Sequence, residues 1–163
     1  MDIRSLAIRL ALLTGYALAA PIQAQQRVSL QPRLETRLDA VLSPSVGVLG
    51  GIGVNVRAGW YARLGVTASA GVVARGDTWE GLQRLDATAR FLFDPFGERA
   101  RGIYGGAGLG LRYDGGRDAR GELLVLLGVE GRPTGRVVPA VEVTLGGGVR
   151  VGVVLRGRRP TGR

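Results

Sequence analysis

Apolar and polar residues alternate one by one along much of the chain, most regularly between residues 60 and 75. One face of that segment carries Trp60, Ala62, Leu64 and further apolar side chains, whereas the other carries mainly Arg, Gly, Thr and Ser. A period of two separates the two sets across a β-strand, but it would spread the apolar residues all round a helix. The segment therefore predicts a strand with one apolar and one polar face.

Further segments repeat this alternation, namely residues 33–42, 46–57, 85–93, 103–114, 122–130, 137–145 and 149–156. The stretches between them are rich in Gly, Pro, Asp and Ser, the residues that favour turns. Most segments are close to the roughly 9–11 residues that a tilted strand needs to cross a lipid bilayer. An even number of strands with short connections predicts an all-β fold, a closed antiparallel up-and-down transmembrane barrel of about eight strands.

Residues 1–24 have the three zones of a secretory signal peptide. Arginines make the start positive, and residues 10–20 form an uncharged apolar run that is shorter than the roughly 20 residues of a membrane-spanning helix. We expect cleavage after Ala24, and the length of the run disfavours the alternative of an uncleaved membrane anchor. The expected organisation is a signal peptide at 1–24, an outer-membrane β-barrel domain at 25–157 and an Arg-rich C-terminal tail at 158–163.

The chain has 22 basic residues, all of them Arg, and 13 acidic ones, which gives a formal net charge of +9. Nucleic-acid binding needs basic residues bunched on one face or in a run. Outside the C-terminal tail the arginines recur singly between apolar neighbours, so we expect no nucleic-acid partner. The chain has no His and no Cys, and therefore lacks the usual general base and thiol nucleophile. No loop has the spacing of a calcium site, and we expect no catalytic residues, no metal and no cofactor.

The alternation fits two arrangements, a membrane barrel with its apolar face outside and a soluble barrel with that face as its core. The aromatic residues favour the first, because they gather near strand ends, where membrane barrels have interfacial girdles. The expected girdle comprises Trp60, Tyr61, Phe91, Phe93 and Tyr104 at one end, with Phe96 in the adjoining turn, and Trp79 and Tyr113 at the other end. The many glycines of the polar face also suit a lumen, where they leave room for long neighbours.

If the polar face lines the lumen, charged residues from all the strands meet in a narrow space. An unpaired buried ion costs several kcal/mol, so arginines and carboxylates are expected to pair there. The predicted network contains Glu35, Arg37, Asp39, Arg57, Arg63, Arg84, Asp86, Arg90, Arg112, Glu122, Glu130, Glu142 and Arg150, and Arg33, Arg75 and Arg156 have the same parity. Water or anions would neutralise the surplus of Arg. Such a lumen is either a structural plug or a narrow anion-preferring passage.

The signal-like start, the amphipathic segments and the aromatic strand ends together resemble the small outer-membrane β-barrel proteins, the group that includes OmpX, OmpW and the transmembrane domain of OmpA. The resemblance covers nearly all of the mature chain, as a pattern and without a diagnostic motif. It implies export to the outer membrane of a Gram-negative cell envelope. The C-terminus departs from the group, whose last strand commonly ends on an aromatic residue, because Leu155 and Arg156 are followed by the tail.

The pattern is consistent with three functions. The first is a non-enzymatic integral outer-membrane protein with a structural or envelope-integrity role. The second is a narrow passage for small anionic solutes, and the third is a secreted soluble β-barrel that binds an apolar ligand. Outer-membrane lipid is the expected partner, and Arg75, Arg117 and Arg120 are candidates for lipopolysaccharide phosphates or for simple solvated charges. The sequence leaves the oligomeric state open.

Overall fold

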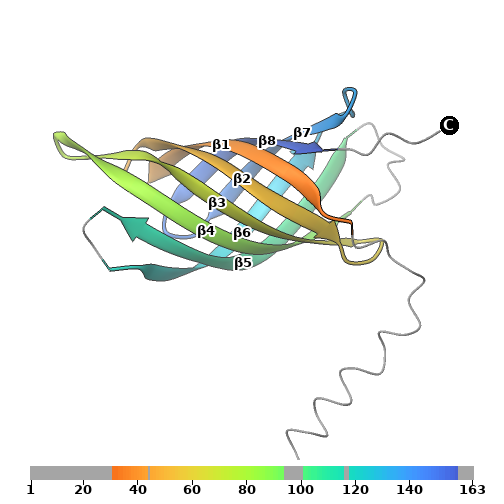
Figure 1. Cartoon of the computed structure of the whole chain (residues 1–163), viewed down its shortest axis with the longest axis horizontal. Coiled ribbons are helices and arrows are strands. Elements are labelled where there is room, and N and C mark those ends of the chain that lie inside the picture. Colours follow the sequence, from red (N-terminus) through yellow and green to blue (C-terminus); the bar gives the residue numbers. More distant parts are fainter. Residues whose placement is uncertain (1–30, 44, 94–100, 116–117, 158–163) are drawn as a thin grey trace, which may run out of the picture.

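The computed structural model describes residues 31–43, 45–93, 101–115 and 118–157, which form one closed barrel (Figure 1). Its strands are β1 (Arg33–Ser43), β2 (Gly47–Arg57), β3 (Ala62–Arg75), β4 (Thr78–Leu92), β5 (Gly102–Asp114), β6 (Arg120–Glu130), β7 (Val137–Leu145) and β8 (Val149–Gly157). Each strand pairs antiparallel with the next, and β1 pairs with β8, which closes the sheet. The all-β up-and-down barrel of eight strands expected from the sequence is therefore confirmed. None of the described residues forms a helix long and apolar enough to cross a bilayer.

Successive side chains point alternately outward and into the barrel, as the pleat of a strand requires. The outward positions hold Leu, Val, Ile and aromatic residues, and Leu109 and Leu123 are 64% and 77% exposed. The inward positions hold most of the charged residues, and Glu35 and Asp39 are 1% and 0% exposed. This distribution is the reverse of that in a water-soluble β-barrel, where the apolar face forms the core.

Both termini of the described chain lie at one end of the barrel, where β1 begins and β8 ends (Figure 1). We call it the terminal end, and the opposite one the far end. The β3–β4 and β7–β8 connections at the far end are tight, and Gly76 and Gly147 have φ values of 60° and 61° there. Glycine adopts such positive φ angles without steric cost, so the turns can reverse the chain within a few residues.

Strand β4 is longer than the sequence predicts, because it begins at Thr78 and the alternation is clear only from Leu85. Its pairing with β3 continues without a break to the far end, where Arg75 lies opposite Thr78. The first half of β4 departs from the pattern, since Gln83 points outward and Leu82 points inward. The backbone ladder therefore fixes this part of the strand, and the side-chain pattern does not.

Pro139 lies in β7 near the terminal end, a position that suits a residue without a backbone N–H. The β6–β7 ladder stops one residue before it, where Glu130 lies opposite Ala140. The Pro139 carbonyl accepts a hydrogen bond from the Gly131 N–H at 2.8 Å. Pro139 therefore lies at the rim of the β6–β7 ladder.

Candidate functional site

The lumen is the candidate site, because ion pairs there cross it between strands that are not neighbours in the sheet, as from Arg90 of β4 to Glu35 of β1 and Glu142 of β7. We call the connected set of residues the lumenal network. It consists of Arg37, Arg63, Arg84, Arg90, Arg150, Arg156, Glu35, Asp39, Asp86, Glu122, Glu130 and Glu142. Strands β1, β3, β4, β6, β7 and β8 contribute to it, so it ties together most of the wall.

Arg90 of β4 reaches across the lumen to β1 and β7. Its Nη2 and Nη1 donate to the two carboxylate oxygens of Glu35 at 3.0 and 3.3 Å, and its Nε lies 3.2 Å from Glu142 Oε2. Arg90 is 2% exposed. Because a guanidinium does not lose its proton in proteins, its burial depends on such partners. The contacts connect strands that are not neighbours in the sheet, and therefore close the interior.

Arg156 of β8 has more partners than any other arginine of the network. Its Nε donates to Glu35 at 2.9 Å, its Nη1 to Glu130 at 2.7 Å, and its Nη2 to the Tyr104 hydroxyl at 2.9 Å. Its Nη2 also lies 3.3 Å from Glu142 Oε2. The guanidinium carbon lies 4.8 Å from the centre of the Tyr104 ring, a cation–π contact. The rigid fork of five donors allows one side chain to satisfy several acceptors at once.

Tyr104 was expected in the aromatic girdle, and the structure shows that this expectation is wrong. The side chain is 1% exposed, and its hydroxyl donates to Glu142 at 3.0 Å. Its ring lies over Gly128, the residue directly opposite on β6, where a Cβ would overlap the ring. The glycine therefore lets Tyr104 bridge from β5 to β7. The parity that Tyr104 shares with Arg112 indicated an inward side chain, but its position near a strand end suggested the girdle.

Arg37 of β1 connects the part of the network at the terminal end with its middle part. Its Nε lies 2.7 Å from Asp39 Oδ2, and its Nη1 lies 3.1 Å from Glu142 Oε1. Asp39 lies 3.9 Å from Arg150 Nη1, and Arg150 Nη2 lies 2.9 Å from Asp86. The network therefore continues without a gap from one part to the other.

Arg84 completes the network toward the far end. Its Nη2 lies 2.8 Å from Glu122 on β6 and 3.4 Å from Asp86 on its own strand. Gly110 lies opposite Asp86 on β5, and a Cβ at Gly110 would be 2.8 Å from the Asp86 carboxylate. Inward glycines thus make room for the long charged side chains beside them, as the sequence suggested.

A second, smaller ionic group lies at the far end. Arg75 Nε lies 2.9 Å from Glu80, its Nη2 lies 2.9 Å from Asp114, and Arg112 Nε lies 2.7 Å from the same Asp114. Arg112 also donates to the Gly147 carbonyl at 2.8 Å. Glu80 and Asp114 were absent from the predicted network, because the first precedes the predicted strand and the second ends one. Extending the alternation of the predicted strand 85–93 backward to Glu80 would have found the first. Asp114 has the same parity as Arg112, which indicated the second.

The lumenal network is electrically neutral, since it contains equal numbers of arginines and carboxylates. Among the described residues, the surplus of Arg that the sequence suggested lies instead at the terminal end, where Arg57 lines the wall beside Arg63. Arg57 differs from the other predicted network residues, because no ion pair joins it to another residue within the described ranges.

Apolar side chains fill much of the remaining lumen. Val41, Leu49, Val73 and Leu82 pack together toward the far end, and Leu92, Tyr104, Leu126, Ala140 and Val154 form a second cluster. The sequence pattern did not predict these clusters, because they consist of single apolar residues set among polar ones. The lumen is therefore packed by both ion pairs and apolar contacts.

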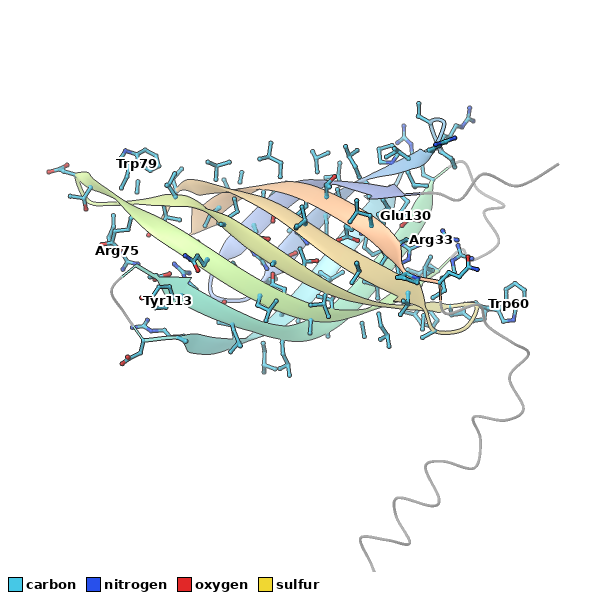
Figure 2. The ribbon with its side chains drawn as sticks, viewed as in Figure 1. Arg33, Trp60, Arg75, Trp79, Tyr113 and Glu130 are labelled. Atoms are coloured by element: carbon cyan, nitrogen blue, oxygen red, sulfur yellow. The ribbon has the colours of Figure 1, made fainter. Side chains whose placement is uncertain are left out.

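The outer wall carries exposed aromatic residues at both ends. Trp60, Tyr61, Phe91 and Phe93 lie toward the terminal end, and Trp79 and Tyr113 toward the far end (Figure 2). The rings of Tyr61 and Phe91 stack with centroids 5.6 Å apart, and Phe93 meets Phe91 edge-on at 5.6 Å. Phe96 lies outside the described residues. Apart from Tyr104, the described girdle residues thus form two outward-facing bands.

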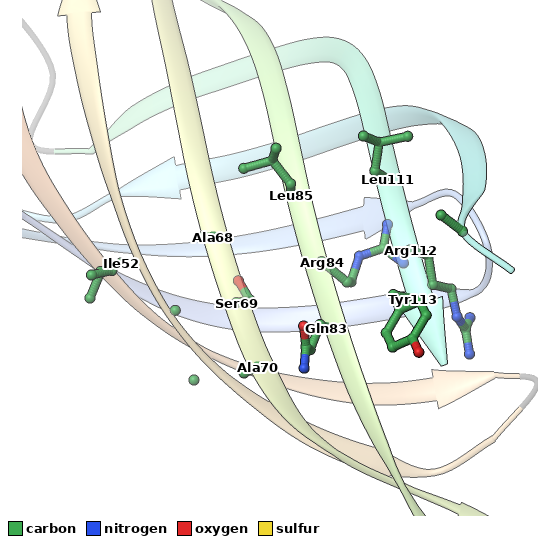
Figure 3. Close-up of a pocket in the computed structure, with 13 residues that line it drawn as sticks. Ile52, Ala68, Ser69, Ala70, Gln83, Arg84, Leu85, Leu111, Arg112 and Tyr113 are labelled. Atoms are coloured by element: carbon green, nitrogen blue, oxygen red, sulfur yellow. The ribbon is translucent and has the colours of Figure 1, made fainter. Parts of the chain in front are cut away.

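Between the bands, the outer wall is apolar and shallowly hollowed. An open depression of about 550 Å³ lies over β2 to β5, where Ala68 and Ala70 are flanked by Ile52, Leu85 and Leu111 (Figure 3). Small side chains lower the surface at its centre, and larger ones form its sides. The wall between the aromatic bands is therefore uneven and largely apolar, with Gln83 as an outward polar residue.

The sequence matches no protein-family model and no curated protein. Its fold is similar to the crystal structure of Neisserial surface protein A (NspA), with a TM-score of 0.60, 19% identity, and coverage of 78% of this chain and 96% of that one. A loop-deletion mutant of OmpT, an outer membrane protein of Vibrio cholerae, aligns with a TM-score of 0.31 and 16% identity over 69% of this chain and 39% of that one. The chain therefore has the fold of the small outer-membrane β-barrels, which confirms the resemblance inferred from its sequence.

Proposed function

We propose that the chain is a non-enzymatic integral outer-membrane β-barrel protein that contributes to envelope structure. The observation that carries the proposal is the reversal of the two faces, with Leu109 and Leu123 exposed on the outside and Glu35, Asp39 and Arg90 buried inside. A largely apolar wall of this size is unfavourable in water and favourable in lipid. Closure of the sheet satisfies every strand edge, as a membrane-spanning sheet requires.

The reversal opposes the soluble alternative. A secreted barrel that binds an apolar ligand needs an apolar cavity inside, but the lumen holds the neutral network and its packed clusters. The same packing favours a plug over a passage for small anions, because paired arginines such as Arg90 and Arg156 leave few free charges to attract an ion. The proposed location is the outer membrane, after cleavage of the signal peptide at 1–24, a segment outside the described residues.

Lipid is the proposed partner of the outer wall. For lipopolysaccharide phosphates, Arg120 is the strongest of the three candidates, because it is exposed at the far end. Arg75 is engaged by Glu80 and Asp114, and Arg117 lies outside the described residues. Binding of lipopolysaccharide at this end is therefore proposed for Arg120 before the others.

Fractionation tests the proposal. Expressed with residues 1–24 in a Gram-negative host, the protein is expected in the outer-membrane fraction, with migration on gels that changes on heating. Purification from the periplasm without detergent would contradict it. Planar-bilayer recordings then distinguish a plugged barrel from a passage. A plugged barrel gives no conductance steps, whereas anion-selective conductance steps would establish the passage.

A further inference from the structure

Arginines line the inner wall at the terminal end on four consecutive strands. Arg57 of β2 lies directly opposite Arg63 of β3, and Arg63 lies directly opposite Arg90 of β4. Arg33 of β1 lies opposite Asn55, the next inward residue of β2 after Arg57. Like charges at opposed positions destabilise a sheet unless counter-charges compensate them. The carboxylates near these arginines therefore determine whether this end is neutral.

Those carboxylates are already engaged. Arg90 is paired with Glu35 and Glu142, and Glu130 is shared between Arg63 and Arg156. Arg57, the next arginine along the wall, therefore has no carboxylate of its own among the described residues. Within the described residues, the terminal end therefore carries a surplus positive charge, whereas the lumenal network is neutral.

Two buried donors at this end have no acceptor within the described part of the chain. They are the Nε atoms of Arg57 and Arg63, both shielded from solvent and without a hydrogen-bond partner. The Arg63 side chain is 6% exposed, so water does not readily replace a missing acceptor there. A buried donor left unsatisfied is unfavourable, and an incoming acceptor would remove that penalty.

We propose that the terminal end of the barrel binds a phosphate group at Arg57 and Arg63, next to Arg33. The planar fork of a guanidinium matches the oxygens of a phosphate, and several oxygens can serve more than one arginine. Arg33 lies at the terminal end (Figure 2), and because Arg33 and Arg57 are only partly buried, an anion reaches them without passing the network. The phosphate is either the headgroup of a membrane lipid or a soluble phosphate, which present the same chemistry.

Titration of inorganic phosphate into the purified protein in octyl glucoside, a detergent without phosphate, tests the site at constant ionic strength. Calorimetry is expected to show saturable binding. Arg57→Gln is expected to weaken it by roughly tenfold or more, because charge-assisted hydrogen bonds are lost. Arg57→Lys keeps the positive charge but lacks the planar fork of donors. Its affinity for phosphate is expected to lie between those of the wild type and Arg57→Gln. Arg132→Gln removes the same charge from an exposed position in the β6–β7 connection and is expected to bind as the wild type does.

A second arm identifies the source. The ³¹P signal of a short-chain phosphatidylglycerol in the micelles reports binding of its headgroup, and calorimetry compares these micelles with micelles doped with the corresponding diacylglycerol, which has no phosphate. Binding of the phospholipid alone assigns the site to a headgroup, and binding of inorganic phosphate assigns it to a soluble ion; both support the proposal.

If neither binds saturably, or if Arg57→Gln binds as tightly as the wild type while its circular dichroism shows a folded barrel, the proposal is wrong. Such a failure would leave the membrane placement untouched, because phosphate binding in micelles does not depend on it.

Discussion

Arg90 and Glu35 form a two-point ion pair across the lumen, with N–O distances of 3.0 and 3.3 Å. Glu35 also accepts a hydrogen bond from Arg156 at 2.9 Å. We predict that Glu35→Gln lowers the free energy of unfolding by about 3–5 kcal/mol, because two buried guanidiniums lose a shared counter-charge. Urea unfolding of the protein in lipid vesicles measures the loss. Leu38→Ile on the outward face of the same strand is the control, and an equal effect of the two changes would refute the prediction.

Removal of one hydroxyl tests the inward placement of Tyr104. Tyr104→Phe keeps the ring over Gly128 but loses the hydrogen bonds with Glu142 and Arg156. We expect a loss of about 1–3 kcal/mol in unfolding free energy, since buried polar partners are left unsatisfied. Tyr113→Phe, on the outer wall, serves as the matched control and is expected to change stability little. Equal effects of the two substitutions would place Tyr104 back in the girdle.

Gly128 is expected to be sensitive to the smallest side chain. Gly128→Ala places a Cβ within the space of the Tyr104 ring. The ring would have to move, at a cost of about 1–3 kcal/mol typical of overpacking. Gly50→Ala is the control, because a Cβ at Gly50 on the outer wall meets nothing within 4 Å. Chemical denaturation in vesicles compares the two, and a Gly128→Ala variant as stable as Gly50→Ala would contradict the packing.

A charge on the outer wall tests its contact with lipid. Leu109 lies in the middle of β5 and points outward, whereas Ile103 lies near the start of the same strand. Leu109→Arg is expected to cost about 2–4 kcal/mol, and Ile103→Arg only about 0–1, because the penalty falls from the bilayer centre to its surface. Unfolding measurements in vesicles give both values. Equal and small costs would be the result for a wall that faces water.

The sequence was enough to predict the number of strands, their faces and most of the charged interior, because each of these follows from a period of two. It was not enough for the first half of β4, where outward Gln83 and inward Leu82 break the alternation and only the ladder with β3 defines the strand. Pattern reasoning also treats residues one at a time, so it did not show that Tyr104 needs the glycine opposite it on β6.

The balance of charge in the lumen was also beyond the sequence. Counting residues gave a surplus of Arg, but the strand registers decide which carboxylate meets which guanidinium. Asp114 and Glu80 add partners for Arg75 at the far end, and the surplus is confined to the terminal end near Arg57. Long-range pairings of this kind depend on closure of the barrel, which no local pattern contains.

The most direct test of the central claim is a spin-label scan along β3 in lipid vesicles. The chain has no Cys, so single-Cys variants carry one label each. If the apolar wall faces lipid, oxygen dissolved in the bilayer relaxes labels at Leu64, Val66 and Ala68 strongly, and labels at Gly65, Thr67 and Ser69 weakly, with a period of two. Labels at the first three positions that respond instead to a water-soluble nickel chelate, with no alternation toward oxygen, would contradict the claim.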